Sequence, residues 1–515
     1  MRLETLCFLS GLEPPTDSDD GAMEITAVVC NSRACVPGCI YVCISGTRAD
    51  GHAFIEEALA RGAAAVVTER NHPMADGFVE KRSSAIFLSS SNTRITAARL
   101  YNAWYANPAE EMRLIAVTGT NGKTTVSSML CAMLEAAGVE TGLIGTVGCR
   151  CRGRMLDIRA ADLCANMTTP DPEQLYHILA VMAREGVRVV VMETTSHALA
   201  LHKLEPLRFD TAIFTNFTED HLDFHGSMEA YFEAKASLLP KASRVILNLD
   251  DAAIASLKER ASGLTVTVST MGADADYLAE DIAYQGTEGV QYTLRERDGL
   301  CEPLFCAVPG AFSVSNTLLA AACARQMGVS CADISKALRD FRGVPGRMER
   351  VDCGDKLPFR AFIDYAHTPD ALEKLLLCAR DFRQDGQRIV LLFGCGGDRD
   401  RAKRPIMAKI AARYADVIYL TSDNSRSEDP EDILDDISRG IPDGVEYIRI
   451  VDRAVAITHA MMHAMPGDII LLAGKGHERY EIDRTGRHPF DERAIARAAV
   501  AGCSSENPGR MNFEN

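Results

Sequence analysis

The sequence predicts an α/β protein of three domains. Short apolar runs that suit buried strands alternate along the chain with helical patterns, and glycine-rich loops follow several of these runs. Strands that alternate with helices form mostly parallel sheets with helices on both faces. The length of 515 residues corresponds to about three domains at about 150 residues each. We expect a small N-terminal α/β domain, a central domain, a C-terminal domain and a disordered tail, at residues 1–109, 110–345, 346–503 and 504–515.

The N-terminal region combines two apolar runs with one short helix. Residues 40–44 and 64–67 are predicted strands, and the alanine-rich segment 53–61 between them is a predicted helix. Asn107-Pro108 is typical of a turn at a boundary. This pattern predicts a small α/β domain.

The central region opens with an apolar strand at 114–117, a glycine-rich loop and a helix. The helix is predicted because its apolar residues fall on one face. Further strands are expected at 187–192, 211–215 and 244–249. The region is therefore predicted to be a parallel-sheet domain of the P-loop type.

The C-terminal region repeats the alternation of strands and helices. Strands are predicted at 389–393, 417–420 and 469–472, with helices at 404–414 and after Pro430. This pattern predicts a second doubly wound, Rossmann-like sheet, whose binding residues should lie at the carboxyl ends of its strands.

Composition limits the binding partners and the cellular compartment that we expect for this protein. The formal net charge is −16, and because nucleic-acid binding normally needs a basic surface we expect no such partner. The 17 cysteines form no CxxC pair and no zinc-like spacing. No signal-peptide pattern and no apolar run of roughly 18 residues is found. Free thiols without these segments predict a cytoplasmic protein.

The loop after the first central strand is predicted to bind the phosphates of ATP. Glycines let backbone N–H groups close on phosphate oxygens, and the helix N-terminus adds partial positive charge. Lys123 can reach the β and γ phosphates, and the Thr124 hydroxyl can ligate Mg²⁺. The alternative is a glycine-rich turn with a solvated lysine, which the strand–loop–helix context disfavours. The predicted ATP-binding residues are Gly119, Thr120, Asn121, Gly122, Lys123, Thr124 and Thr125.

This loop and a series of further motifs resemble the Mur ligases, whose relatives include the folylpolyglutamate synthases. The series is most similar to the tripeptide-forming branch of the family and follows its order over nearly the whole chain. It consists of TGTNGKTT at 118–125, TTPDP at 168–172, ETTSHAL at 193–199, TNFTEDHLDFHG at 215–226, NLDD at 248–251, GVPGRMERV at 343–351, DYAHTPDALE at 364–373, FGCGGDRDRAKRP at 393–405, DNSR at 423–426 and GKGHE at 474–478.

The resemblance implies an amide-forming reaction of cell-wall precursor synthesis. ATP would phosphorylate the side-chain carboxyl of D-Glu in UDP-MurNAc-L-Ala-D-Glu. An amine of meso-diaminopimelate would then attack this acyl phosphate, which is a far better acyl donor than a carboxylate. ATP as co-substrate, two Mg²⁺ ions as cofactors and a monomeric protein are expected. The enzyme's contribution would be positioning and stabilisation of negative charge.

The resemblance also implies a catalytic set consisting of Lys123, Glu193, His221 and Lys235. Thr124, Glu193 and His221 are the candidate metal ligands, and oxygen donors suit Mg²⁺. Glu193 follows an apolar strand, where we expect its carboxylate to be exposed at the sheet edge. Lys235 matches the lysine that is carbamylated in the family. The alternatives are a structural histidine at His221 and a surface lysine at Lys235.

Further ATP contacts are implied in the later regions, so closure between domains is expected to assemble the site. These residues are Asn316, Arg347, Asp364, Tyr365 and His367.

The UDP-sugar-peptide substrate is expected to contact both earlier regions. Three residues depart from the family pattern: Asn31 stands in place of Asp, Met167 in place of Asn, and Thr195 in place of Ser. Lys203 stands where Arg is common, which keeps the charge but loses the bidentate fork. The expected contacts are Ser32, Arg33, Thr168, Thr169, Thr195, Ser196 and Lys203.

Specificity for the added amino acid is expected in the C-terminal region. The DNSR segment resembles the family's diaminopimelate motif, with Ser425 in place of Pro. The Arg426 guanidinium can pair bidentately with the distal carboxylate that lysine lacks, and it would stay unpaired with lysine. The alternative is a polar helix-capping loop. The implied diaminopimelate contacts are Arg399, Asp423, Asn424, Ser425, Arg426, Gly474 and Glu478.

Three other functions stay open at this point. The same reaction with L-lysine would need another partner for Arg426. A folate-tail glutamate ligase is disfavoured by the DNSR and GKGHE segments and by the separate N-terminal region. A non-catalytic nucleotide-binding protein is disfavoured by the intact catalytic set.

Overall fold

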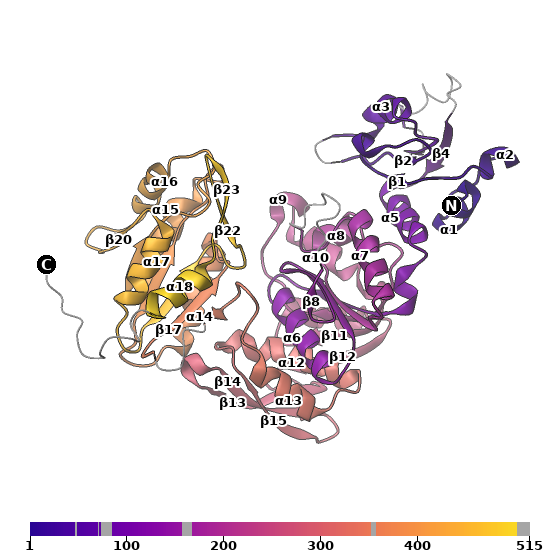
Figure 1. Ribbon diagram of the computed structural model, residues 1–515. Coiled ribbons are helices and arrows are strands. Elements are labelled where there is room, and N and C mark those ends of the chain that lie inside the picture. The colour runs from indigo at the N-terminus through magenta and orange to yellow at the C-terminus, as the bar shows by residue number, and fades with distance from the viewer. Residues whose placement is uncertain (47–48, 71, 74–84, 157–166, 352–356, 502–515) are drawn as a thin grey trace. The chain divides into compact units, whose positions relative to one another are not determined.

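The computed structural model describes residues 1–46, 49–70, 72–73, 85–156, 167–351 and 357–501. The chain forms two compact units, residues 1–268 with 319–329 and residues 269–318 with 330–515. The predicted α/β class with parallel sheets is confirmed (Figure 1). The tail predicted at 504–515 lies outside the described residues.

The N-terminal sheet is a parallel four-stranded sheet in sequential order. The predicted strands at 40–44 and 64–67 are β2 and β3, and the predicted helix is α3, preceded by a 3₁₀ turn over Gly51–Phe54. Ile55 and Ala58 of α3 pack with Val66 of β3 in one core. The elements are α1 Leu3–Ser10, β1 Val28–Val29, β2 Ile40–Val42, α3 Ile55–Ala60, β3 Ala65–Glu69, β4 Ile86–Ser90 and α5 Thr93–Trp104.

The central sheet of the first unit has the phosphate-loop strand in its interior. The order is β12-β11-β10-β5-β9-β6-β7-β8, parallel from β12 to β6 and antiparallel beyond. The chain passes from β9 on one side of β5 to β10 on the other, the kind of crossing at which α/β sheets bind ligands. The strands are β5 Arg113–Thr118, β6 Thr141–Gly145, β7 Gly148–Cys151, β8 Arg154–Met155, β9 Val189–Glu193, β10 Phe209–Phe214, β11 Ala242–Asn248 and β12 Leu264–Ser269.

Helices cover this sheet because their apolar stripes face it. In the phosphate-loop helix the predicted apolar face is buried. A second amphipathic helix, α7, buries Leu175, Ile178 and Met182 in the same core as β9. The helices are α6 Lys123–Ala136, α7 Pro172–Arg184, α8 Ser196–Ala200, α9 Leu222–His225, α10 Met228–Ala236 and α11 Ala252–Ser256.

The second unit contains an antiparallel meander and a six-stranded sheet. The sheet order is β16-β17-β21-β18-β19-β20, antiparallel only at β16. Leu391 and Phe393 of β18 face one core and Val390 and Leu392 face the other, so both faces of the sheet are covered as predicted. The strands are β13 Tyr277–Tyr284, β14 Val290–Glu296, β15 Cys301–Cys306, β16 Glu349–Arg350, β17 Arg360–Asp364, β18 Ile389–Phe393, β19 Val417–Leu420, β20 Ile448–Arg449 and β21 Ile469–Ala473, with a hairpin of β22 Tyr480–Asp483 and β23 Gly486–Pro489.

Helices lie on each face of this second sheet. Residues of α14, α15 and α16 contribute to one core and residues of α17 and α18 to the other. The first helix, α12, begins in this unit, and its residues from 319 onward belong to the first unit. The helices are α12 Ala311–Gln326, α13 Cys331–Asp340, α14 Pro369–Phe382, α15 Lys403–Tyr414, α16 Pro430–Ser438, α17 Arg453–Met462 and α18 Glu492–Ala501. Across the described ranges, none of the helices combines the length and apolar character required to span a bilayer.

Candidate active site

The predicted phosphate loop connects β5 to α6. Gly119 has φ +143°, and a Cβ there would lie 1.9 Å from Thr215 Oγ1, so only glycine fits. Gly122 has φ +85° and precedes the first turn of α6. Lys123 Nζ donates to the carbonyl oxygens of Gly119 at 2.9 Å and Thr120 at 2.8 Å. The loop therefore curls around its own lysine at the N-terminus of a 14-residue helix.

Side chains that follow β10 hold the phosphate loop in place. Thr215 Oγ1 donates to the Asn121 carbonyl at 2.6 Å, and Asn216 Oδ1 accepts from the Asn121 N–H at 2.9 Å. Thr120 Oγ1 donates to the Thr218 carbonyl at 3.1 Å. These bonds order the loop because they replace hydrogen bonds that its backbone would otherwise make to water.

Glu193, the last residue of β9, is fully buried, with 0% exposure. The expectation that its carboxylate would be exposed at the sheet edge is therefore wrong, because β9 lies between β5 and β6. Its Oε2 accepts from the hydroxyls of Thr124 at 2.8 Å and Thr146 at 3.0 Å, and its Oε1 from the Thr146 N–H at 2.8 Å. Burial raises the pKa of Glu193, although these hydrogen bonds act to lower it.

The oxygen atoms around Glu193 suit a divalent cation. The Thr124 hydroxyl and the Glu193 carboxylate are hard donors of the kind that Mg²⁺ prefers. A Cβ at Gly145 would lie 2.1 Å from Glu193 Oε1, so glycine at this position leaves room for the carboxylate. Thr146 was not predicted as a site residue. No sequence pattern marks it, because it follows the end of β6 and meets Glu193 only in the fold.

His221, the third predicted metal ligand, belongs to a cluster of aromatic side chains. Its backbone has φ +53°, and its ring lies edge-on to the rings of His197 at 4.7 Å and Tyr231 at 6.1 Å between centroids. Its Nε2 is 3.5 Å from Asp220 Oδ2, and the side chain is 43% exposed. Such a left-handed backbone is uncommon for a non-glycine residue and clusters at functional sites.

Lys235 lies on α10 and is only 2% exposed. The surface-lysine alternative is therefore wrong. Its Nζ donates to the Gly119 carbonyl at 2.9 Å and lies 4.6 Å from the centre of the Tyr231 ring. Burial, and then the nearby Lys123 charge, hold the pKa of Lys235 well below its usual value, although Asp220 acts to raise it. Lys123 and Lys235 share the Gly119 carbonyl, so the structure brings these two predicted residues together.

The residues predicted to contact the muramyl-peptide continue from Glu193. Thr169 Oγ1 donates to the Glu193 carbonyl at 2.9 Å and lies 3.2 Å from Thr195 Oγ1. Thr195 caps α8, since its Oγ1 accepts from the Ala198 N–H, so Thr in place of Ser keeps a capping hydroxyl. The other predicted contacts each have a partner as well. Ser196 Oγ is 3.0 Å from His225 Nε2, and Thr168 Oγ1 is 3.0 Å from Thr146 Oγ1. Lys203 Nζ is 2.7 Å from Asp171 Oδ1.

Ser32 and Arg33 lie in a 3₁₀ turn of the N-terminal sheet region. Ser32 Oγ donates to Glu57 Oε2 at 2.6 Å, and Arg33 is exposed. Asn31, the departure from the family's Asp, still accepts the Arg33 N–H at 3.0 Å. The substitution therefore keeps the local turn.

Four predicted nucleotide contacts gather at the carboxyl end of β17 in the second unit. The Arg347 guanidinium lies 5.2 Å from the Tyr365 ring centre, and the His367 ring 4.6 Å from it. Asp364 accepts the N–H groups of Met348 at 2.8 Å and Ala366 at 2.9 Å. His477, which was not predicted, has its ring centroid 5.0 Å from that of Tyr365, and its buried Nδ1 has no hydrogen-bond partner among the described residues. Asn316, the fifth predicted contact, is buried on α12.

The predicted amino-acid contacts lie where β18, β19 and β21 end. Arg426 has φ +51°, and its Nη1 donates to the Gly397 carbonyl at 2.8 Å. A Cβ at Gly396 would lie 2.9 Å from Arg426 Nη1 and 3.8 Å from Arg399 Cγ, so both arginines flank this glycine. The predicted residues Asp423, Asn424 and Ser425 are buried, Gly474 (φ +119°) lies against Asp423 Oδ2, and Glu478 Oε2 accepts from Asn424 Nδ2 at 2.8 Å.

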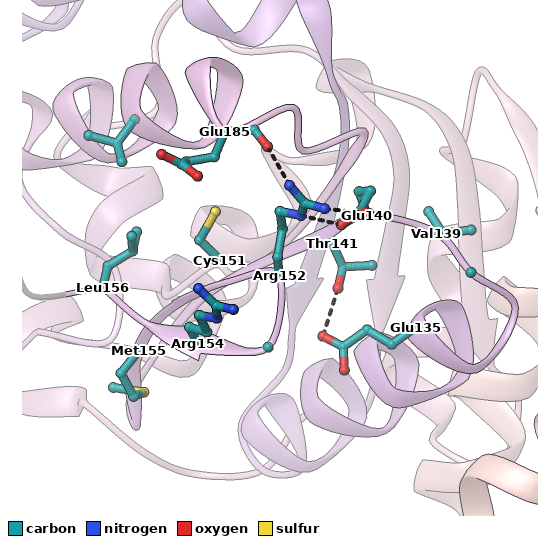
Figure 2. A pocket seen from close by; sticks show the side chains of 13 residues that line it. Glu135, Val139, Glu140, Thr141, Cys151, Arg152, Arg154, Met155, Leu156 and Glu185 are labelled. Atoms are coloured by element: carbon teal, nitrogen blue, oxygen red, sulfur yellow. Dashed lines mark hydrogen bonds and ion pairs between the residues drawn. The ribbon is translucent and has the colours of Figure 1, made fainter.

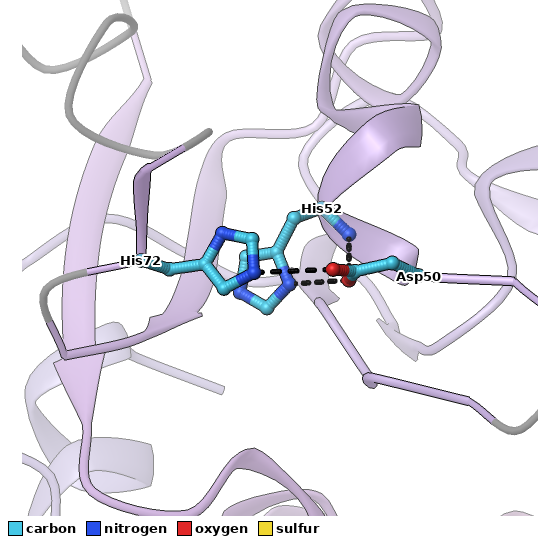
Figure 3. Close-up of side chains that lie close together, drawn as sticks. All are labelled: Asp50, His52 and His72. Carbon is cyan, nitrogen blue, oxygen red and sulfur yellow. Dashed lines mark hydrogen bonds and ion pairs between the residues drawn. The ribbon is translucent and has the colours of Figure 1, made fainter.

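Asp50, His52 and His72 form a compact cluster in the N-terminal region (Figure 3). His52 Nδ1 is 2.7 Å from Asp50 Oδ1, while His52 Nε2 accepts the Glu69 N–H at 3.1 Å. The proton of neutral His52 is therefore on Nδ1. A metal would need a lone pair on that atom, so this cluster is a hydrogen-bonded structural group.

A groove lies at the amino end of β6, which is the opposite end of the parallel sheet from the phosphate loop (Figure 2). Two of its charged lining residues are paired with each other: Arg152 Nε and Nη2 donate to the Glu140 carboxylate, at 2.6 and 2.9 Å. Thr141 Oγ1 donates to Glu135 Oε1 at 2.8 Å. None of the predicted catalytic residues lines this groove.

The phosphate loop, the buried carboxylate beside it and the second doubly wound sheet define a phosphate-loop, nucleotide-binding enzyme. Three family descriptions match the chain in order: "Mur ligase family, catalytic domain" at residues 24–117, "Mur ligase middle domain" at 117–324 and "Mur ligase, glutamate ligase domain" at 346–476. The chain belongs to the Mur ligase family, whose members are ATP-dependent, amide-forming ligases that use Mg²⁺.

Named relatives agree with this assignment. The UDP-N-acetylmuramoyl-L-alanyl-D-glutamate--2,6-diaminopimelate ligase of Synechococcus elongatus is 42% identical over 93% of this chain and 94% of its own. The protein of the same name from Trichormus variabilis is 40% identical over 96% and 98%. A solved structure with that name has a TM-score of 0.69 at 29% identity and covers 98% of this chain and 100% of its own.

Proposed function

We propose that this chain adds meso-diaminopimelate to the D-Glu side-chain carboxyl of UDP-MurNAc-L-Ala-D-Glu in peptidoglycan precursor synthesis. The observation that carries the choice of amino acid is Arg426, held by the Gly397 carbonyl beside the Asn424–Glu478 pair. A cationic fork next to a carboxylate suits a ligand end that carries both a carboxylate and an ammonium. Gly474 and Glu478 would receive the ammonium, and Arg426 with Arg399 would receive the carboxylate.

In the first chemical step, a carboxylate oxygen of D-Glu would bond to the γ-phosphorus of ATP as the bond to the β-phosphate breaks, which gives the acyl phosphate and ADP. The phosphate loop and Lys123 would hold the triphosphate, and Thr168, Thr169, Thr195, Ser196 and Lys203 would orient the acceptor. Two bound Mg²⁺ ions would neutralise the repelling phosphate and carboxylate charges, with Thr124, Glu193 and His221 as ligands. The amine would then displace phosphate from the acyl phosphate, forming the amide and releasing a proton.

Lys235 is proposed to carry a carbamate. A neutral amine is needed for this modification: its nitrogen forms a bond to the carbon of CO₂ and loses one proton. The lowered pKa of Lys235, caused first by burial, favours that neutral form. The product is an anion, which would be attracted to Lys123 where the ammonium is repelled.

The remaining assignments complete this proposal. Ser32 and Arg33 would contact the uridine side of the substrate, and Asn316, Arg347, Asp364, Tyr365 and His367 would contact ATP. The N-terminal, central and C-terminal domains would span 1–109, 110–345 and 346–503. The protein would act as a monomer in the cytoplasm, where ATP and the UDP-linked precursor are present.

The test is phosphate release by the purified protein with ATP, Mg²⁺ and UDP-MurNAc-L-Ala-D-Glu. Each assay would contain one amino acid: meso-diaminopimelate, L-lysine, L-ornithine or L-glutamate. We expect turnover with meso-diaminopimelate alone. Turnover with L-lysine alone would overturn the choice of amino acid. Turnover only in a separate assay, in which a folate and glutamate replace the UDP-linked acceptor and the amino acid, would overturn the reaction.

A further inference from the structure

Lys475 is a fully buried cation beside the proposed amino-acid site, with 0% exposure. It lies two residues after the end of β21, and its Nζ donates to Asn424 Oδ1 at 3.0 Å and to the Tyr480 carbonyl at 3.2 Å. Asp423 Oδ1 lies 3.6 Å away, and the Phe490 ring centre 5.3 Å away. Burying a charge is costly unless it is paired and hydrogen-bonded. Lys475 meets both conditions, so its charge is held inside the protein.

The bond from Lys475 determines how the Asn424 side chain is turned. Asn424 Oδ1 accepts two donors, Lys475 Nζ and the Ile482 N–H, both at 3.0 Å. A flipped amide would place its NH₂ group against those two donors, because an ammonium and a backbone N–H cannot accept. Only one amide orientation is therefore compatible with Lys475.

This orientation directs the Asn424 amide nitrogen to Glu478. Asn424 Nδ2 donates to Glu478 Oε2 at 2.8 Å, and the second hydrogen of the NH₂ group leaves one further donor. The Arg426 N–H donates to the Ile482 carbonyl at 3.0 Å, so Asn424 and Arg426 are both bonded to the same residue of β22. Lys475 is thus bonded to the Asn424 amide and linked through it to Glu478, and Ile482 links Asn424 to the Arg426 backbone.

Buried charges around Lys475 neutralise one another within the protein. Arg453 pairs with Glu492 at 2.7 Å, and it also donates to the Ser422 and Ala473 carbonyls at 3.2 and 2.8 Å. Burial acts to raise the pKa of Asp423, but Lys475 and Arg453 hold it below its usual value. Asp423 is therefore ionised and paired with Lys475, whereas Glu478 is bonded to the neutral Asn424 amide and can pair with a ligand ammonium.

We propose that Lys475 is a positioning residue that sets specificity for an amino acid whose far end is zwitterionic. By fixing the Asn424 amide it holds Glu478 for the ammonium and the Arg426 segment for the carboxylate. This proposal rests on the proposed function, because it needs that site to bind the amino acid that is added.

The test compares Lys475→Met with Lys409→Met, which removes an exposed lysine of α15. Initial rates would be measured with each of the three substrates varied in turn, and melting temperature would report folding. In Lys475→Met we expect KM for meso-diaminopimelate to rise at least about tenfold, since a positioned charge contact is lost. KM for ATP and for the UDP-linked acceptor should stay within about twofold, as should every constant of Lys409→Met. A folded Lys475→Met enzyme with the wild-type KM for diaminopimelate would overturn the proposal.

Asn424→Asp keeps the test decisive if Lys475→Met fails to fold. The new carboxylate retains an acceptor for Lys475 but replaces the donor that faces Glu478 with an acceptor. We expect a similar rise in KM for diaminopimelate with the fold retained, and the wild-type KM in this variant would overturn the proposal.

A double-mutant cycle separates positioning from general stabilisation. If Lys475 acts through Asn424, the double variant should be no worse than the weaker-binding single variant. If the two single-variant effects on KM multiply in the double variant, Lys475 acts by another route and the proposal is overturned. Wild-type protein that does not use diaminopimelate would instead refute the proposed function, so the two failures are distinct.

Discussion

The phosphate-loop site of the first unit and the amino-acid site of the second bury charge in different ways. Around the phosphate loop, Glu193 is hydrogen-bonded by threonine hydroxyls and a backbone N–H, and Lys235 by a backbone carbonyl. In the second unit, buried charges pair with opposite charges: Arg453 with Glu492 at 2.7 Å and Arg404 with Glu428 at 2.8 Å. The first site stabilises charge by neutral dipoles and the second by ion pairs.

The difference has a direct consequence for protonation. Burial raises the pKa of Glu193 and lowers that of Lys235, so each is displaced toward its neutral form. In the second unit the pKa of Asp423 stays low, despite burial, because Lys475 and Arg453 are close, whereas burial raises the pKa of Glu492 even beside Arg453. We therefore expect substitutions in the first site to change turnover, and substitutions in the second to change the affinity for the amino acid.

The largest effect is expected for Lys235→Ala. If Lys235 carries the proposed carbamate, kcat should fall by about 10³-fold, within the range for a positioned charged group. Added short-chain carboxylates should restore part of the activity, because they can occupy the space of the lost anion. The measurement is phosphate release with and without formate or acetate.

Lys258→Ala, which removes an exposed lysine of the same unit, is the matched control and should keep the wild-type kcat. Full activity of Lys235→Ala would exclude Lys235 from the site.

Glu193→Gln should lower kcat by about 10²-fold, because the charge that would face the cation is removed. The thermal stability of this variant should not fall with its activity. The raised pKa shows that the ionised carboxylate is unfavourable in the fold, so a neutral amide should keep or raise the melting temperature at pH 7.5. Rate assays and thermal melts on the same sample measure both, with exposed Glu259→Gln as the control. A Glu193→Gln variant with the wild-type kcat and a lower melting temperature would contradict the conclusion that neutral dipoles hold this buried carboxylate.

Arg426→Lys should act on affinity rather than turnover. A lysine keeps the charge but loses the planar fork, so KM for meso-diaminopimelate should rise by about tenfold to about a hundredfold while kcat changes little. Arg439→Lys, at an exposed arginine directly after α16, should have no effect. A large fall in kcat at saturating diaminopimelate would show that the second site also contributes to the chemistry.

The smallest effect is expected from pH. Burial lowers the pKa of His367 and of His477 below the ordinary value of 6.5. The unfolded chain takes up protons at these residues near that pH and the folded chain only below it. Their contribution to stability is therefore complete above pH 6.5 and is lost as pH falls through the folded pKa. Melting temperature should fall by a few degrees toward about pH 5.5, and by less in His367→Gln/His477→Gln.

Many elements of the fold could be predicted because their signals are local. The apolar runs at 114–117, 389–393 and 469–472 are strands, and the glycines of the phosphate loop lie where a strand meets a helix. The roles of Thr146, Tyr231 and Lys475 could not be found in this way, although Lys475 lies within the GKGHE segment. Each acts on a residue far away in sequence, as Tyr231 does on Thr120, 111 positions earlier.

The sequence alone determined which segments are strands, where phosphate could bind and which chemistry-bearing residues the chain carries, because periodicity and turn residues act over a few positions. Only the tertiary structure decided the electrostatic state of those residues. Glu193 is buried by strands on both sides, and Lys235 meets a carbonyl 116 positions away. Desolvation depends on every neighbour in space, and no local pattern of residues specifies it.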